Sequence, residues 1–344
     1  MSIATERRKG PLELKETMVR KDFQVWKEPG QQHKLRWGPP GTKVHMCLDR
    51  ARLITESYKQ TEGEPEVIRR AKALAHILEN MTIYIRGRER IVGNFASDPA
   101  SLPILPELAT EWLEEQVKEE WHDLLDEKGH HEFEEIMAYW RGRSIDAKVK
   151  NIMPNSLRKW MIWNGLVNTD NYQVDGAMPV LNYEKVLHLG LEGVIRQAED
   201  RLLQLQSDVP VEGTNVGNWM EQVNFLKAAI ISCRGAITFA NRFAKLSREM
   251  AEKEEYQQRK EELLEVAENC ERVPQFPATT LHQALQSLWF TYLIRSMIEA
   301  YGSGWGARLD QLMYPFYKRD NDEGRITREK AQELLEFLWL KIEE

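Results

Sequence analysis

Apolar and polar positions follow helical spacing over most of the chain from residue 44 onward. Between residues 47 and 58, apolar or small side chains recur among charged ones at the spacing of one helix face: Cys47, Ala51, Leu53, Ile54 and Tyr58. This pattern predicts a helix that packs on one side. Gly63 and Pro65 end it, and a second helix is predicted from Glu66 to about Met81.

The pattern then changes to two short β-like runs, 83–85 and 91–92, with Gly93-Asn94 as a turn. Helical patterns return afterwards. They cover 106–125, 132–165 with a break near Pro154, 184–206, about 216–272, and about 279–300. The charged stretch 248–262 is typical of a solvated helix face. Residues 1–43 are predicted to form an irregular arm, and 44–344 one continuous unit, because no repeat or low-complexity linker divides them.

The amino-acid composition indicates a folded protein and argues against several kinds of partner. The hydrophobic content of 42% with 11 tryptophans permits a sizeable core. The formal net charge of −7 argues against nucleic acid or an anionic membrane as a partner. Three widely spaced cysteines form no disulfide or metal pattern and fit a reducing cytoplasm. The first 15 residues have no apolar core of the kind a signal peptide needs, and no uninterrupted apolar run predicts a membrane span.

Three ordered blocks of sequence carry a family resemblance. The first contains Arg50–Tyr58, Thr61–Pro65, Ile91–Asn94 and Pro106-Glu107; the second Ala284–Gln286, Glu299, Gly302, Arg308–Gln311 and Tyr314-Pro315; the third Gly324–Thr327, Glu333–Leu335 and Leu338-Trp339. With these motifs in this order, the chain resembles the glycyl radical enzymes, the family related to pyruvate formate-lyase and the radical diol dehydratases.

The resemblance implies a helix-rich α/β fold. The family fold is a ten-stranded barrel of two half-barrels wrapped in helices, and this chain would supply outer helices and part of the first half-barrel. Members are well over twice as long and carry a thiyl-forming cysteine and a radical glycine, both expected beyond Glu344. The segment 44–344 is therefore predicted to be the N-terminal portion of a pyruvate formate-lyase-like domain, incomplete at its C-terminus, and no catalytic residue is expected within it.

The same resemblance implies the chemistry and the partners. A separate radical S-adenosylmethionine activase would install the glycyl radical, which abstracts hydrogen from the cysteine thiol, and the thiyl radical then abstracts hydrogen from substrate. No cofactor is expected on this chain itself. The expected partners are the activase, the missing C-terminal half and, for the full-length protein, a second copy in a homo-oligomer.

Two candidate substrate contacts lie in the glycine-rich segment 302–306. In similar proteins the equivalent loop lines the substrate cavity, which here points to Ser303 and Gly304; a plain helix-terminating loop is the alternative. No imidazole is present, which weighs against a polyol substrate. Arg308 could bind a carboxylate through two parallel hydrogen bonds. The favoured interpretation is a structural pair with Asp310 that supports the start of a strand.

Two more candidates lie in the segment 168–183, where relatives place two pocket side chains eight positions apart. The better register selects Asp170 and Met178, and a slipped register would select Tyr172 and Asp175. Met178 offers a polarizable apolar contact. The pocket therefore favours an aromatic or hydrocarbon substrate, handled by fumarate addition or arylacetate decarboxylation. The alternatives are a diol- or choline-type lyase, or a truncated, non-catalytic remnant or binding subunit.

The remaining signals have simpler explanations. His130-His131 lies among glutamates but lacks the H-E-x-x-H spacing, and the start of an acidic helix explains it better than a metal site. Cys47, on a helix face, and Cys233 are predicted to be core residues, and Cys270 to be partly exposed. None has a neighbouring base or cation that would activate it as a nucleophile.

Overall fold

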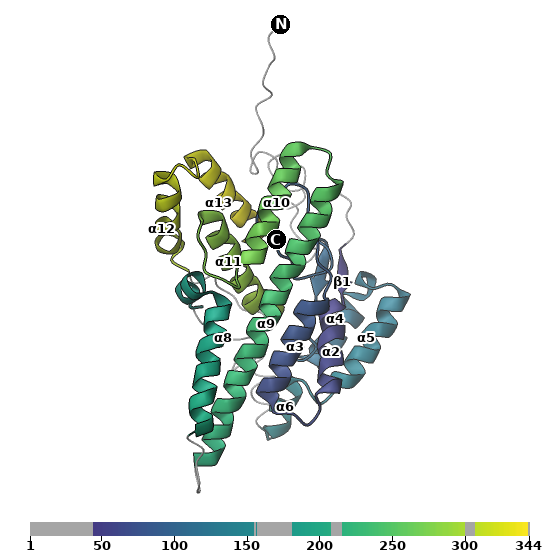
Figure 1. Ribbon diagram of the computed structural model, residues 1–344. Helices are drawn as coiled ribbons and strands as arrows, with labels where there is room; N and C mark the ends of the chain where they lie inside the picture. The colour runs from purple at the N-terminus through teal and green to yellow at the C-terminus, as the bar shows by residue number, and fades with distance from the viewer. Residues whose placement is uncertain (1–43, 155, 157–180, 208–214, 300–306, 343–344) are drawn as a thin grey trace.

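The computed structural model describes residues 44–154, 156, 181–207, 215–299 and 307–342. Helices dominate (Figure 1), and the longest, α9 (Asn215–Lys253), crosses the molecule from end to end. It packs against α3 on one side, against α8 on another, and against α10 along its C-terminal part. The helix-rich fold class is confirmed. The ten-stranded barrel stays a prediction, because the described residues contain a single two-stranded sheet.

The first two predicted helices form where the sequence pattern places them. They are α2 (Asp49–Gln60) and α3 (Glu66–Asn80), joined by a turn in which Gly63 adopts a φ of +89°. Their apolar faces are buried, with Leu78 and Ala51 at 0% exposure. Full burial of one such leucine contributes about 1.5–3 kcal/mol. These two helices form the layer that supports the site described below.

The predicted strands at 83–85 and 91–92 are wrong. The sheet consists of β1 (His45–Cys47) and β2 (Ser101–Pro103), which pair in parallel with His45 opposite Ser101. In the segment 82–94, side chains bind the main chain in place of a strand ladder. The Asn94 amide accepts a hydrogen bond from the Tyr84 N–H at 3.2 Å and donates one to the Thr82 carbonyl at 2.9 Å. Ile85, Ile91 and Val92 are buried and Ile83 is partly buried, and this burial explains the β-like pattern.

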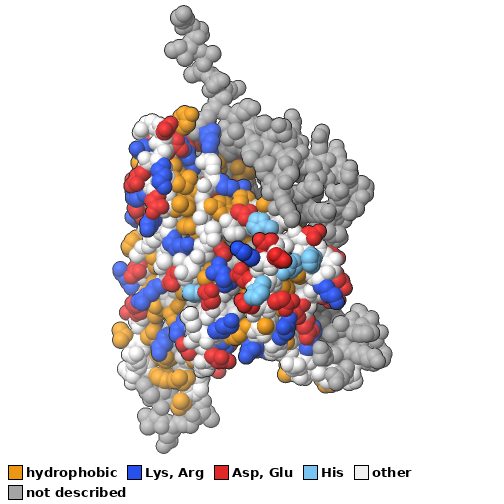
Figure 2. Space-filling view, turned by 90° about the vertical axis from the view of Figure 1, so that its right-hand side faces the viewer, with side chains coloured by type: hydrophobic (Ala, Val, Ile, Leu, Met, Phe, Trp, Pro, Cys, Tyr) orange, Lys and Arg blue, Asp and Glu red, His pale blue; other side chains and the backbone are white. Residues whose placement is uncertain are grey.

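Short helices follow the sheet. They are α4 (Thr110–Glu119), the 3₁₀ turn η2 (His122–Leu124), α5 (Glu127–Trp140) and α6 (Ile145–Ile152). Asp126 caps α5 by accepting from the Gly129 N–H at 2.7 Å, and Ser144 caps α6 by accepting from the Ala147 N–H at 3.2 Å. Each cap stabilises its helix by about 1 kcal/mol. The side of the molecule that carries α5 mixes acidic, basic and histidine side chains without a patch of one charge (Figure 2).

Helix α8 (Tyr183–Ser207) is bent where Gly190 leaves helical geometry with a φ of +68°. A Cβ at this position would lie 2.3 Å from the Gln275 carbonyl oxygen, so only glycine permits the close approach of the two chains. The predicted tract 216–272 is divided into α9 and α10 (Gln257–Arg272). The turn between them falls inside the stretch 248–262. That stretch is therefore not one solvated face, and Glu262 in it is buried.

Helix α9 is the one described helix long and apolar enough to cross a membrane by length and composition, over Val216–Lys253. Its middle and C-terminal parts pack into the protein core. Phe239 and Phe243 of α9 meet Phe290, with ring centroids 5.1 to 5.9 Å apart. These packing contacts account for the apolar residues of that part of the helix, whereas Met220 and Phe225 nearer its start are exposed.

The last described elements are α11 (Leu281–Leu293), its π-helical continuation η4 (Ile294–Glu299), α12 (Leu309–Asp322) and α13 (Arg328–Ile342). Cys47 belongs to strand β1 and not to a helix face, although it is buried as predicted. Cys270 is buried, and the prediction of partial exposure is wrong. Burial raises the pKa of the Cys270 thiol and raises the pKa of Cys233 to about 11. Both thiols are therefore protonated near neutral pH.

Candidate functional site

Four charged side chains from distant parts of the chain meet in the interior, and we name this group the ion cluster: Arg50, Arg70, Glu107 and Glu299. Arg50 of α2 binds the Glu107 carboxylate with both terminal nitrogens, Nη2 to Oε1 at 2.6 Å and Nη1 to Oε2 at 3.1 Å. The two side chains are 2% and 4% exposed. Such a forked, parallel pair is the strongest geometry available to arginine and a carboxylate.

Arg70 of α3 joins this pair to the end of η4. Its Nη1 donates to Glu107 Oε1 at 3.2 Å, and its Nε donates to a Glu299 carboxylate oxygen. A further nitrogen of Arg70 donates to the Glu299 main-chain carbonyl. Arg50 reaches the same end, with Nε 2.6 Å from the Ile298 carbonyl oxygen and Nη2 3.0 Å from that of Glu299. The cluster thus connects α2, α3 and the turn before α4 to the end of η4.

The surroundings of Glu107 and Arg70 shift the pKa of each toward its charged form. Burial by itself raises the pKa of Glu107, but Arg50 and Arg70 outweigh it and hold that pKa below its ordinary value. Burial lowers the pKa of Arg70, but Glu299 and Glu107 raise it above the ordinary arginine value. Glu107 therefore remains an anion and Arg70 a cation near neutral pH. A buried pair of this kind holds chain segments in place.

A second junction lies between the segment 91–94 and α11. The Gln286 side chain, 0% exposed, accepts from the Val92 N–H at 2.9 Å and donates to the Val92 carbonyl at 2.8 Å. Gly93 follows with a φ of +138°, and a Cβ there would lie 2.8 Å from Leu293 and from Trp289. Only glycine fits this close approach. Sequence segments that carry the family resemblance are thus in contact at both junctions: Arg50 with Glu107 and Glu299, and Val92 with Gln286.

Of the five predicted site residues, the structure describes only Arg308. Asp170, Met178, Ser303 and Gly304 lie outside the described residues. Arg308 immediately precedes α12, so the predicted strand start is wrong. Its side chain is 71% exposed, and its Nε lies 3.7 Å from Asp310 Oδ1. At this exposure the pair contributes about 0–1 kcal/mol, and the guanidinium remains accessible to a further anionic group.

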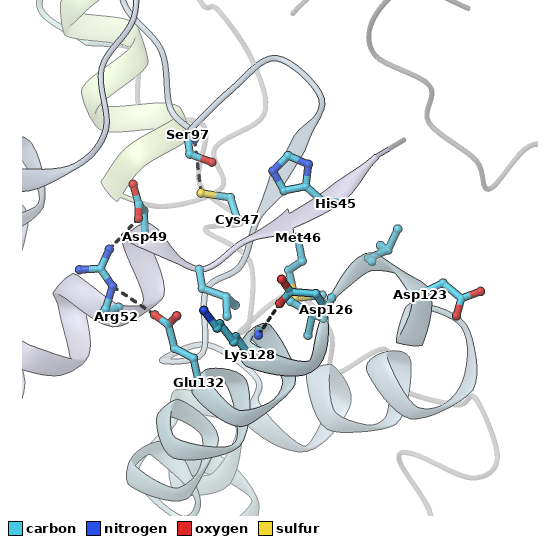
Figure 3. A pocket seen from close by; sticks show the side chains of 14 residues that line it. His45, Met46, Cys47, Asp49, Arg52, Ser97, Asp123, Asp126, Lys128 and Glu132 are labelled. Atoms are coloured by element: carbon cyan, nitrogen blue, oxygen red, sulfur yellow. Dashed lines mark hydrogen bonds and ion pairs between the residues drawn. The ribbon is translucent and has the colours of Figure 1, made fainter. Parts of the chain in front are cut away.

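An open pocket of about 420 Å³ lies between the start of α2 and the start of α5 (Figure 3). Its charged side chains bind mainly one another. Arg52 donates to Asp49 Oδ1 at 2.6 Å and to Glu132 Oε1 at 3.1 Å, and His45 lies 2.8 Å from Asp98. Because the arginine is paired with two carboxylates, the pocket offers a ligand less charge than its composition suggests. No group of three or more potential metal ligands gathers in the part of the chain described.

Sequence reasoning missed the ion cluster as a unit. Arg50, Glu107 and Glu299 lie in the sequence motifs that carry the family resemblance. Their place in these motifs could have indicated that they are important. Arg70 carries no such signal, since an arginine beside Arg69 on a charged helix face reads as solvated. Its role depends on a partner 229 positions away.

Comparison with known proteins gives this geometry its context. The family model described as "Pyruvate formate lyase-like" matches residues 26–344. Isethionate sulfite-lyase from Desulfovibrio desulfuricans is 33% identical over 318 residues, which cover 88% of this chain and 38% of that protein. Trans-4-hydroxy-L-proline dehydratase from Clostridioides difficile is 30% identical, covering 90% and 39%. Indoleacetate decarboxylase from Tractidigestivibacter scatoligenes is 28% identical, covering 87% and 37%.

Solved structures agree. A structure from a study of 1,2-propanediol dehydration in Roseburia inulinivorans matches with a TM-score of 0.78 and 35% identity, covering 87% of this chain and 36% of that one. A glycyl radical enzyme from Archaeoglobus fulgidus matches with a TM-score of 0.76 and 34% identity, covering 88% and 38%. The chain spans less than two-fifths of the length of these relatives. It belongs to the pyruvate formate lyase-like family, and its relatives are glycyl radical lyases and dehydratases.

Proposed function

We propose that this chain forms the N-terminal part of an anaerobic glycyl radical lyase. The observation that carries the proposal is the family match over residues 26–344. It is supported by the structural match at 35% identity, which covers only 36% of the longer relative. The remaining part of such an enzyme would hold the radical glycine and the thiyl cysteine.

The proposed reaction proceeds by hydrogen transfer. The glycyl radical takes a hydrogen atom from the cysteine thiol, and the thiyl radical takes one from a substrate C–H bond. The glycine C–H is restored by the reverse transfers after the substrate radical has reacted. A radical S-adenosylmethionine activase would generate the first radical. In this scheme the present chain excludes water and forms part of the pocket wall, which is a matter of positioning and burial.

The proposed pocket contacts are Asp170, Met178, Ser303, Gly304 and Arg308. The methionine and the absence of imidazole in segment 302–306 support an aromatic or hydrocarbon substrate. The match to indoleacetate decarboxylase supports this choice, since the substrate in the name of that enzyme is an arylacetate. Fold and overall similarity leave the substrate open, because function is decided by the side chains of the site.

A second candidate is a lyase for a small polar substrate. It is favoured by the higher identity to isethionate sulfite-lyase, 33%, and to the protein studied in 1,2-propanediol dehydration, 35%. A polar substrate requires several hydrogen-bond partners in the pocket, and of the five proposed contacts only Asp170, Ser303 and Arg308 have polar side chains. A non-catalytic binding subunit is the third candidate.

The proposal is tested by sequencing the native DNA beyond the codon for Glu344 and expressing the full reading frame without oxygen together with its activase. A frame with cysteine and glycine loops, a glycyl radical signal in electron paramagnetic resonance, and turnover of an arylacetate would support it. Turnover of isethionate or a diol alone would favour the second candidate. A stop directly after Glu344, with no complementary half encoded nearby, would leave the binding-subunit hypothesis.

A further inference from the structure

The end of the π-helical segment η4 is secured by arginines from another layer of the fold. The last carbonyls of a helix have no partner within the helix. Here Arg50 donates to Ile298 O at 2.6 Å and to Glu299 O at 3.0 Å, and Arg70 donates to Glu299 O as well. Two cations at a helix C-terminus also complement its dipole. Short π-helical segments frequently occur at functional sites.

Arg70 is the residue through which this anchoring reaches the side chain of Glu299. Its guanidinium contacts the carboxylates of both Glu107 and Glu299, and it is one-quarter exposed, whereas Arg50 is 2% exposed. Glu107 in turn orients both arginines from the turn before α4. The position of Glu299 therefore depends on three segments that lie outside α11 and η4.

We propose that Arg70 and Glu107 are positioning residues of the enzyme, which act through Glu299 to hold the end of η4. The proposal rests on the proposed function, because Glu299 directly precedes the segment that carries the predicted substrate contacts. Neither residue is assigned a contact with substrate. Together they hold the main-chain carbonyl and the side chain of Glu299 in place. Their loss therefore loosens the end of η4 more than it loosens the surrounding helices.

Arg242 provides a matched control for this role. Its guanidinium donates to Leu78 O at 2.7 Å and to Met81 O at 2.6 Å, and so it caps the end of α3 as Arg50 caps the end of η4. Neither of these two hydrogen bonds involves the ion cluster. Replacing Arg242 removes an arginine cap of the same kind, and it tests whether any such loss loosens the end of η4.

The experiment is hydrogen exchange followed by mass spectrometry on this chain, comparing wild type, R70K and R242K. Lysine keeps the charge but cannot make the forked contacts of arginine. In R70K we expect exchange in peptides covering residues 294–299 to rise about tenfold while α9 and α10 stay within twofold of wild type. In R242K we expect the rise near residues 78–82 and no change at 294–299.

E107D provides a second variant, since it keeps the charge and withdraws the carboxylate from Arg70, and the same expectation applies. Unchanged exchange at 294–299 in both R70K and E107D would overturn the proposal. An equal rise across α9, α10 and 294–299 would also overturn it, because that result marks a general structural role. Activity does not enter the readout, so failure of this inference and failure of the proposed function are seen separately.

Discussion

Arg50 and Arg90 are equally buried, at 1% exposure each, yet their surroundings differ. Every nitrogen of the Arg50 guanidinium donates, to the Glu107 carboxylate and to the carbonyls of Ile298 and Glu299. Arg90 donates through Nη2 to Glu265, while its Nε and Nη1 have no hydrogen-bond partner among the described residues. Its Nη1 lies 3.7 Å from the Glu262 carboxylate.

The second arginine belongs to a group that we name the α10 cluster: Arg90, Glu262, Glu265 and His282. Both ring nitrogens of His282 lie 2.8 Å from acceptors, Nδ1 from Glu265 and Nε2 from the Arg90 carbonyl. Both bonds form together only when the ring is protonated. The Glu265 side chain is 45% exposed, so water reaches this cluster but not the Arg50–Glu107 pair. The two arginines are thus equally buried, but we expect the stability of the fold to depend more on the partners of Arg50 than on those of Arg90.

Removing the shared carboxylate of the ion cluster should have the largest effect. In E107A, Arg50 would lose the carboxylate that it binds, and Arg70 would keep that of Glu299. We expect the free energy of unfolding to fall by about 3–5 kcal/mol, because an uncompensated buried charge remains. Urea denaturation measures this loss. A loss below about 1 kcal/mol would show that the ion cluster is no more critical than a surface pair.

Replacing each buried arginine by methionine tests the comparison directly. R50M should cost about 3–5 kcal/mol, since it removes the forked partner of the buried Glu107, which keeps one bond to Arg70, and the donor to the Ile298 carbonyl. R90M should cost less than about 2 kcal/mol, because it removes two unsatisfied nitrogens, leaves Glu265 in contact with water and leaves Glu262 paired with Arg259. Equal losses in the two variants, measured by the same denaturation experiment, would break the comparison.

Acid titration should reveal the α10 cluster. Burial opposes ionisation of Glu265, but the hydrogen bond and charge of His282, together with Arg90, lower its pKa from 4.5 to about 2. A carboxyl whose pKa is lower in the folded state stabilises the fold above its unfolded pKa, and this contribution is lost as the pH falls. Wild type should therefore lose stability between about pH 4.5 and 2, and E265Q should lose less over that window.

Thermal unfolding at several pH values checks this expectation. E199Q is a suitable control, since the pair of Glu199 and Arg234 joins α8 to α9 and lies outside the α10 cluster. If E265Q and wild type lose stability in parallel between about pH 4.5 and 2, the assigned role of Glu265 is wrong.

The smallest effect is expected at an exposed arginine pair of ideal geometry. Arg248 binds Glu271 through two bonds of 2.7 Å, as forked as the Arg50–Glu107 pair, but both side chains are more than 40% exposed. R248M should change the free energy of unfolding by less than about 1 kcal/mol. A loss approaching that of R50M would show that geometry, and not burial, decides the effect.

The fold was predictable from sequence where the signal was local. Helices α2 and α3 follow from one-sided apolar spacing and from the Gly63–Pro65 turn. The β-like pattern at 83–92 was misleading because a buried loop here contains the same isoleucine and valine residues that a strand would bury. The exposure of Cys270 was predicted wrongly for a similar reason. Its position near the end of a helix indicated exposure, but the packing of α10 buries it. These errors arise where burial is set by segments distant in sequence.

The candidate site was predictable only in part. Arg50, Glu107 and Glu299 belong to the sequence motifs that carry the family resemblance, but the resemblance assigned them no role. It assigned pocket contacts to five residues, of which only Arg308 is described, and the strand that Arg308 was expected to start is a helix. Arg70 was not singled out at all. The missing information was the set of contacts across the fold, which one sequence does not contain.

The sequence by itself determined the helix periodicity, the glycines at turns and close approaches, and the family to which the chain belongs. Each of these is encoded in neighbouring residues or in short sequence motifs that occur in a fixed order. Only the tertiary structure decided which charges are buried and with which partners. Arg50, Arg70 and Arg90 look alike in the sequence, and their environments differ because the partners come from segments up to 249 residues away. The energy of a buried charge depends on those partners, and packing alone brings them together.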